Sequence, residues 1–136
     1  MTHPGTVALD TSAYSHMIAG HEGVLDAVAR AEVVYVPAIV LGELEAAFRL
    51  GRRQKQNHRA LTEFLDEPFV EVLSVTPSVA QRYGRLFAEL RTMGRPLPIS
   101  DVWIAATSLD GGAHLLTFDR DFERIVGLDH TLFDPA

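Results

Sequence analysis

The chain has 136 residues, of which 47% are hydrophobic and 22% are charged, and its formal net charge is −6. This length predicts one compact domain over residues 1–136 that buries roughly two-thirds of the surface of the unfolded chain. The absence of cysteine excludes disulfides, thiolate zinc sites and cysteine nucleophiles. The negative net charge argues against unspecific attraction to nucleic acid, but it does not exclude nucleic acid as a substrate.

The N-terminus lacks the pattern of a secretory signal. Its first six residues contain no basic segment that leads into an apolar one, and nowhere do about 18 apolar residues run together. We therefore expect a cytoplasmic protein with no membrane-spanning segment, which agrees with the absence of cysteine.

The chain alternates between short β-branched apolar runs, typical of buried strands, and segments with an apolar stripe, typical of helices. The expected elements are, in order, a strand at 6–9, helices at 13–19 and 22–29, a strand at 33–36, helices at 38–50 and 52–65, a strand at 69–75, helices at 79–93 and 101–110, and a strand at 114–117. Ser78 is expected to open the helix at 79–93. This alternation predicts an α/β fold, a three-layer α/β/α sandwich with a mainly parallel central sheet.

The helix expected at 101–110 has marked ends and an apolar surface. Ser100 is suited to be its N-cap, the prolines before it prevent an earlier start, and Gly111 and Gly112 allow the chain to leave the helix. Because its apolar side chains cover more than one stripe, the helix is expected to be buried on more than one side. Asp101 in the first turn is a charged residue in this otherwise apolar helix. Which groups its carboxylate faces is therefore important for the function.

Five acidic side chains are placed where a parallel sheet would bring them together. Asp10 follows the first strand, Asp119 and Asp121 follow the strand at 114–117, and Asp101 and Glu43 lie near helix starts. Loops and helix starts beyond the carboxyl ends of parallel strands gather at one edge, so we expect these acids to converge. Crowded carboxylates repel one another unless a cation compensates them, and an all-oxygen set suits Mg²⁺ or Mn²⁺. Two such ions can activate water in phosphodiester cleavage.

Each acid also has a simpler interpretation. Asp10 and Asp101 fit helix caps or first-turn acids, and Asp119 and Asp121 fit solvated turn residues. Glu43 lies in a mostly apolar helix, where a buried glutamate without a partner is unusual, although it can instead face solvent. The joint pattern favours a site over these separate roles.

Four short motifs carry a resemblance to a known family. They are residues 7–12 (VALDTS), 41–44 (LGEL), 99–106 (ISDVWIAA) and 115–122 (LLTFDRDF). In order and spacing they resemble the PIN-domain ribonucleases, and more narrowly the VapC-type toxins of bacterial type II toxin–antitoxin systems. The resemblance implies a PIN-like fold and metal-dependent endonucleolytic cleavage of RNA by a homodimer, which a VapB-type antitoxin holds inactive.

The same resemblance implies roles for particular residues. The residues that match the family's catalytic and metal-binding acidic quartet are Asp10, Glu43, Asp101 and Asp119, with Asp121 as an additional or alternative metal ligand and Glu43 contacting the ion through water. Thr11 and Thr117 match small hydroxyl positions that orient a carboxylate or a water molecule. Whether Asp119 or Asp121 is the principal fourth acid stays open at this point.

Basic residues are unevenly placed, because nine of the twelve lie between Arg49 and Arg95. Within this stretch Arg49, Arg52, Arg53 and Lys55 are candidates for an RNA-binding surface. The same charge run also fits a solvated helix face.

Two other functions share an acidic pocket on this kind of fold. A receiver-like phosphoacceptor needs a lysine after a late strand, but the single lysine, Lys55, lies in a predicted helix. A dehalogenase-type phosphatase needs Asp-x-Asp after the first strand, where this chain has Asp10, Thr11 and Ser12. A non-catalytic binding module of the same fold is a further alternative, and the complete acidic quartet argues against it.

Overall fold

The structure of the protein is a computed structural model that describes residues 4–135, so the ends of the predicted 1–136 domain lie outside the described residues. In this part of the chain five strands form one sheet in the order β3-β2-β1-β4-β5, and every neighbouring pair is parallel. The strands are β1 (Thr6–Leu9), β2 (Val33–Pro37), β3 (Val70–Leu73), β4 (His114–Thr117) and β5 (His130–Leu132). The predicted parallel sheet is confirmed.

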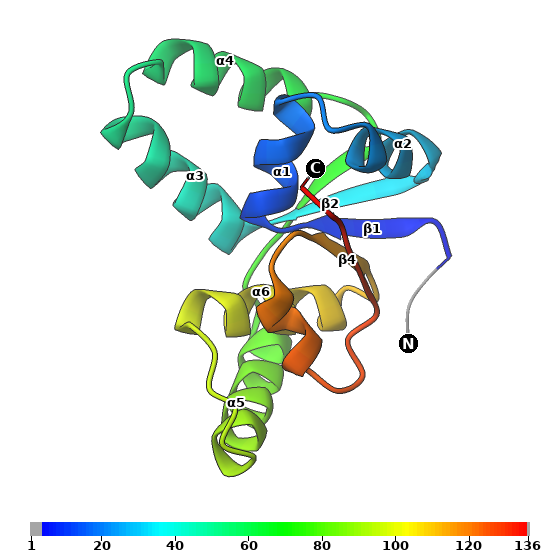
Figure 1. Cartoon of the computed structure of the whole chain (residues 1–136), viewed down its shortest axis with the longest axis vertical. Coiled ribbons are helices and arrows are strands. Elements are labelled where there is room, and N and C mark those ends of the chain that lie inside the picture. The colour runs from blue at the N-terminus through cyan, green and yellow to red at the C-terminus, as the bar shows by residue number, and fades with distance from the viewer. Residues whose placement is uncertain (1–3, 136) are drawn as a thin grey trace.

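Helices cover both faces of this sheet. They are α1 (Thr11–Ile18), α2 (Glu22–Arg30), α3 (Ala38–Leu50), α4 (Gln54–Leu65), α5 (Pro77–Thr92) and α6 (Ile99–Asp110), with a 3-10 turn, η1 (Arg120–Arg124), after β4. Figure 1 shows α1 to α4 on one side of the sheet and α5 and α6 on the other. The predicted three-layer α/β/α sandwich is therefore confirmed.

The direction in which the chain crosses the sheet changes at β1. From β1 the chain moves outward through β2 to β3, and it then returns to place β4 on the other side of β1. β1 pairs with β2 through Ala8 and Tyr35, and with β4 through Leu9 and Leu116. In parallel α/β sheets, ligands bind beyond the carboxyl ends of the strands at such a switch point. The segments that follow β1 and β4 are therefore the first place to look for a site.

The two central strands give this edge a rigid base. Ala8, Leu9, Leu115 and Leu116 are each 2% exposed or less. Burial of a leucine side chain contributes about 1.5–3 kcal/mol, so the ends of β1 and β4 are held firmly in the core. Residues directly after them start from fixed backbone positions.

Helix α6 forms one wall beside this edge and is buried on more than one side, as predicted. Its fully buried side chains include Val102, Ile104, Ala105 and Ala106. On another side of the helix, Trp103 stacks on Tyr83 of α5, with ring centroids 3.8 Å apart and planes 11° apart. These contacts fix α6 against both the sheet and α5.

The predicted N-cap of α6 is wrong. The cap position is Pro98, whose carbonyl accepts hydrogen bonds from the amides of Asp101 and Val102, while Ser100 lies inside the first turn. The fixed φ of proline suits the turn before a helix, so no side-chain cap is needed there. At the other end the prediction is confirmed, because Gly112 has a φ of 63° and leads the chain out of the helix.

Other elements also differ from the prediction: α1 begins at Thr11 and not at residue 13, and β3 ends at Leu73 and not at residue 75. Strand β5 was not predicted, because a strand of only three residues gives too short a run for an alternation to show. Helix α5 begins at Pro77 with Thr76 as its N-cap, not at Ser78. Helix α4 begins at Gln54, two residues later than expected.

None of the helices in the described residues is long and apolar enough to cross a membrane.

Candidate active site

Asp10 is buried at the carboxyl end of β1, with 3% of the residue exposed. Its Oδ1 accepts hydrogen bonds from the amide of Ala13 and the hydroxyl of Ser12, both at 2.7 Å, and its Oδ2 accepts one from the hydroxyl of Thr117. Asp10 is thus the N-cap of α1, as its sequence position suggested. The same carboxylate lies at the switch point of the sheet, so its capping of α1 does not exclude a role in a site there.

Two hydroxyl groups connect Asp10 to the segment after β4. The Thr117 hydroxyl, which donates to Asp10, accepts the amide of Asp119 at 2.9 Å. The Ser12 hydroxyl, which also donates to Asp10, accepts the amide of Phe118 at 3.0 Å. The start of α1 and the segment after β4 are therefore held together by one hydrogen-bond network centred on Asp10.

Burial is the main influence on the pKa of Asp10 and raises it above its ordinary value. The hydrogen bonds from Thr117, Ala13 and Ser12 lower the pKa and so oppose this effect, whereas the charge of Asp119 adds to the rise. The surroundings of Asp10 therefore combine an unfavourable burial of charge with donors that stabilise the same charge.

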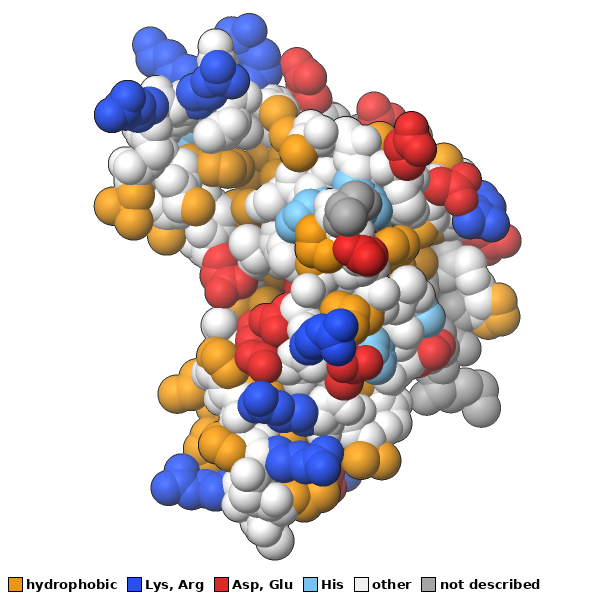
Figure 2. Space-filling model, viewed as in Figure 1, with side chains coloured by type: hydrophobic (Ala, Val, Ile, Leu, Met, Phe, Trp, Pro, Cys, Tyr) orange, Lys and Arg blue, Asp and Glu red, His pale blue; other side chains and the backbone are white. Residues whose placement is uncertain are grey.

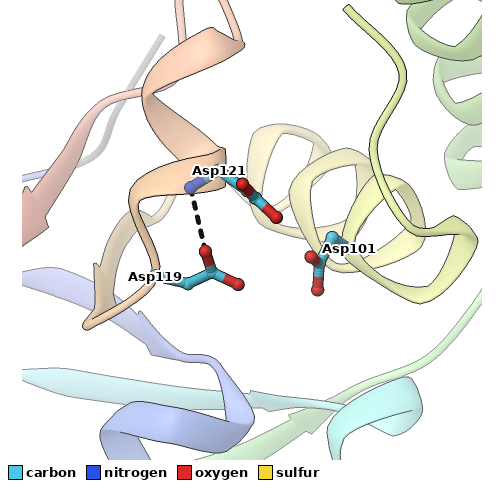
Figure 3. A group of neighbouring side chains, drawn as sticks. All are labelled: Asp101, Asp119 and Asp121. Carbon is cyan, nitrogen blue, oxygen red and sulfur yellow. Dashed lines mark hydrogen bonds between the residues drawn. The ribbon is translucent and has the colours of Figure 1, made fainter.

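Asp101, Asp119 and Asp121 converge at the same edge. Each offers a carboxylate oxygen, and these three atoms lie within 4.8 Å of one another. Figure 3 shows the side chains pointing toward one another from the start of α6 and from the segment after β4. Asp119 Oδ1 accepts the amide of Asp121 at 2.9 Å and caps η1. This 3-10 turn places both acids in the group.

The carboxylate of Asp101 has the most perturbed environment of the group. Its pKa is raised to about 7, first by burial and then by the negative charges of Asp119, Glu43, Asp121 and Asp10. Among the described residues its carboxylate has no hydrogen-bond donor. Within the described residues one ion pair meets this group, between Arg124 and Asp121 Oδ1 at 3.5 Å, so most of its negative charge is not compensated and the arrangement is electrostatically unfavourable.

Glu43 reaches the site from α3. The hydroxyl of Thr11 donates a hydrogen bond to Glu43 Oε1, which connects α3 to the start of α1. Glu43 is half-buried and adds to the negative charge that raises the pKa of Asp101. The predicted supporting residues thus have defined contacts: Thr11 orients Glu43, and Thr117 orients Asp10.

The structure separates the predicted acids into two sets. Asp101 and Asp119, with Asp121, form the close group, whereas Asp10 and Glu43 are not part of it within the described residues. Ser12 was not predicted as a site residue, yet it bridges two segments of the site. A hydroxyl two residues after a capping aspartate was the available signal, because such pairs hydrogen-bond locally.

The chemistry of this donor set fits a divalent cation. The ligand atoms are all carboxylate oxygens. Mg²⁺ and Mn²⁺ prefer such oxygen ligands, whereas Zn²⁺ and copper favour nitrogen and sulfur ligands. The raised pKa of Asp101 has mutual repulsion among its causes, and a cation between the carboxylates removes that repulsion. The residues of the site therefore fit the predicted divalent metal.

The predicted RNA-binding residues lie apart from this group. Arg49 is near the end of α3, and Arg52, Arg53 and Lys55 lie in or beside the start of α4. All four are exposed.

The fold is that of a known family. A family model described as "PIN domain" matches residues 7–128, and the chain belongs to the PIN-domain family. Within that family its resemblance is to VapC-type toxins, as the four motifs predicted.

Two curated relatives carry this resemblance in sequence. Ribonuclease VapC5 of Mycobacterium tuberculosis is 27% identical over 126 residues, which are 93% of this chain and 92% of that protein. Ribonuclease VapC4 of the same organism is 30% identical over 87 residues, which are 64% of this chain and 67% of that protein.

Solved structures of toxin–antitoxin systems have the same fold. A chain of VapBC2 from Rickettsia felis, bound to a promoter DNA fragment, is 26% identical with a TM-score of 0.83, and the match covers 94% of this chain and 98% of that one. A chain of VapBC-5 from Mycobacterium tuberculosis is 26% identical with a TM-score of 0.73, and the match covers 96% of this chain and 98% of that one.

Proposed function

We propose that this protein is a metal-dependent endoribonuclease and the toxin of a toxin–antitoxin pair. The observation that carries the proposal is the convergence of Asp101, Asp119 and Asp121, with carboxylate oxygens within 4.8 Å, at the switch point where Asp10 is buried. The names of the curated relatives support RNA as the substrate, because both are called ribonucleases.

The acidic residues have two roles in the proposed mechanism, as ligands of the metal and as acceptor of the water proton. Asp10, Asp101, Asp119 and Asp121 would hold Mg²⁺ or Mn²⁺, with Glu43 acting through water. When bound, such an ion lowers the pKa of water and stabilises negative charge on the leaving oxygen. In hydrolysis the water oxygen forms a bond to phosphorus while one P–O ester bond breaks. A carboxylate of the site accepts the water proton, and the leaving ester oxygen takes up a proton to become a hydroxyl.

The supporting hydroxyls keep this arrangement fixed. Thr117 and Ser12 hold Asp10 in one orientation, and Thr11 does the same for Glu43. Because the hydroxyl donors are already directed at the carboxylates, the acids need little rearrangement when substrate arrives. This preorganisation is what the network around Asp10 contributes to catalysis.

The proposal includes the partners of a VapC-type toxin. The VapBC titles of the similar structures support a VapB-type antitoxin as the inhibitor. We further propose a homodimer, a single domain over the whole chain and a cytoplasmic location.

Cleavage of RNA by the purified chain, freed of any antitoxin, tests the activity. We expect cleavage with Mg²⁺ or Mn²⁺ and none with EDTA. The Asp101→Asn variant keeps the shape of the side chain but removes a negative charge, and we expect it to lower the rate on the order of 100-fold or more. Glu89→Gln, which removes an exposed acid on α5, is the matched control and should cleave normally. Cleavage that persists in EDTA or in Asp101→Asn would overturn this mechanism.

A further inference from the structure

Five basic side chains gather at the turn between α3 and α4. This basic tip consists of Arg49, Arg52, Arg53, Lys55 and Arg59, a cluster within eleven consecutive residues of a chain whose net charge is −6. All five are exposed. In Figure 1 the α3–α4 turn lies at the outer end of the part of the molecule formed by α3 and α4, and Figure 2 shows basic side chains gathered over that end.

The cations of the basic tip are not used within the fold. Among residues 4–135, none of the five lies within 4.0 Å of a carboxylate oxygen. Of the seven arginines elsewhere in the described residues, three form such ion pairs (Arg30 with Asp26, Arg82 with Asp110 and Arg124 with Asp121) and four do not, so what distinguishes the tip is that its five unpaired cations are clustered. Cations that repel one another and have no internal partner are available to an external anion.

The surface between these cations is lined by hydrogen-bond donors. The side chains of Arg52, Arg53, Gln54, Lys55 and Gln56 line one open hollow at the start of α4. Each of them carries N–H groups, and three also carry positive charge. Such a surface matches phosphate oxygens, which accept several hydrogen bonds at once.

The basic tip is also held in place. His58 on α4 lies 3.0 Å from Glu45 Oε2 on α3, and its Nδ1 lies 3.0 Å from the carbonyl oxygen of Gln54. The same imidazole packs edge-on against Phe48, with ring centroids 5.2 Å apart. These contacts join α3 to the first turn of α4, so the cations are presented on a braced surface.

One helix joins the basic tip to the acidic site. Helix α3 carries Glu43 at the site and Arg49 six residues further on, which is about 9 Å along the helix axis. Figure 2 shows acidic side chains in the hollow between the part of the molecule formed by α3 and α4 and the part formed by α5 and α6. It shows basic side chains at the outer end of the α3–α4 part. A polyanion that enters the acidic hollow meets repulsion there, and cations beside the hollow offset this repulsion.

We infer that the basic tip binds the phosphate backbone of the RNA strand beside the bond that is cut. This inference rests on the proposed function, since it takes the acidic group as the place of cleavage. The tip contacts phosphates away from the reacting one, so it contributes to substrate affinity and not to the chemical step. It recognises the charge of the backbone and no particular base.

A binding experiment with the full chain tests this role directly. The probe is a fluorescein-labelled single-stranded RNA of 20 nucleotides and mixed sequence, in EDTA, titrated at several KCl concentrations. We expect Arg52→Gln/Arg53→Gln to weaken binding about tenfold and to reduce the slope of log K against log[KCl] by about 1.4, which is about 0.7 for each phosphate that is no longer neutralised. Arg30→Gln/Arg85→Gln changes the net charge equally, on α2 and α5, and should bind like the wild type.

Steady-state cleavage with Mn²⁺ gives a second readout. The same double variant should raise KM about tenfold and leave kcat unchanged, whereas a variant that merely unfolds lowers kcat. Equal losses in the Arg30→Gln/Arg85→Gln control would overturn the inference, because charge alone would then explain them. So would unchanged RNA binding combined with weaker binding of the antitoxin. If the wild type does not cleave RNA at all, the proposed function fails, while the binding experiment still decides the role of the tip.

Discussion

Asp10 and Asp101 lie at the same edge of the sheet, yet their surroundings differ sharply. The Asp10 carboxylate accepts three hydrogen bonds, from Ala13, Ser12 and Thr117, and caps α1. The Asp101 carboxylate receives none from the described residues and has its pKa raised to about 7. One acid is part of the architecture, and the other is held beside like charges that the fold alone does not compensate.

This difference teaches that acids of one site can have opposite effects on stability. Removing Asp10 breaks a network on which two segments depend, whereas removing the charge of Asp101 relieves repulsion. The pKa of both acids is raised, so ionisation of either disfavours folding, but only Asp10 also accepts three hydrogen bonds that are lost when its carboxylate is removed. Stability and activity should therefore change in the same direction at Asp10 and in opposite directions at Asp101.

The largest effect is expected from Asp10→Ala. This change leaves the Ala13 amide and two hydroxyls without their acceptor and removes a helix cap, so we expect a loss of about 3 kcal/mol in the free energy of unfolding. Urea denaturation measures this loss. Asp26→Ala, which breaks only the exposed pair with Arg30, is the control and should cost less than about 1 kcal/mol. Similar losses in the two variants would show that the Asp10 network contributes no more to stability than an exposed ion pair.

Metal affinity should depend on pH around the pKa of Asp101. Because metal ligation requires the ionised carboxylate, affinity for Mn²⁺ should be nearly constant above pH 8 and fall by up to about tenfold for each pH unit below 7. Calorimetric titration in buffers of different ionisation enthalpy also reports the proton released on binding. An affinity that is flat between pH 5 and 8 would contradict the raised pKa.

Asp101→Asn should stabilise the metal-free protein in a pH-dependent manner. The pKa of Asp101 is raised from 3.8 to about 7, so its favourable contribution is complete below pH 3.8 and is lost as the pH rises through 7. At pH 8 we expect a gain on the order of 1 to 2 kcal/mol, a value discounted because the group is only half-buried. Thermal denaturation from pH 4 to pH 8 measures the gain, which should shrink toward the acid end. A variant less stable than the wild type at pH 8 would refute the comparison.

Thr117→Val should give the smallest change. It preserves shape but removes the donor to Asp10 and the acceptor of the Asp119 amide, at a cost of about 1 kcal/mol. We also expect slower cleavage, because Asp10 loses one of the groups that orient it. Thr6→Val at the start of β1 is the control and should leave both stability and cleavage unchanged. A Thr117→Val variant that behaves like this control would show that the hydroxyl does not position Asp10.

The parallel sheet and its acidic edge could be predicted because buried strands and the residues after them follow local rules. Asp10 and Asp119 were placed by the ends of β1 and β4, which hydrophobic runs make visible. Whether Asp121 joins Asp119 or replaces it stayed open in the sequence, since the position of both side chains in one group depends on the 3-10 turn. The hydrogen bond from the amide of Phe118 to the Ser12 hydroxyl could not be predicted either, because the two residues lie far apart in the sequence.

The acids of the site are widely spaced along the chain, from Asp10 to Asp121, and this spacing affects how the protein is made. Asp10 is fixed by Thr117, and Asp119 and Asp121 follow β4, so the acidic group cannot assemble before β4 pairs with β1. A growing chain that ends before residue 114 therefore contains no complete acidic group. During translation the acidic group is therefore absent until the chain has extended past Asp121 and β4 has paired with β1.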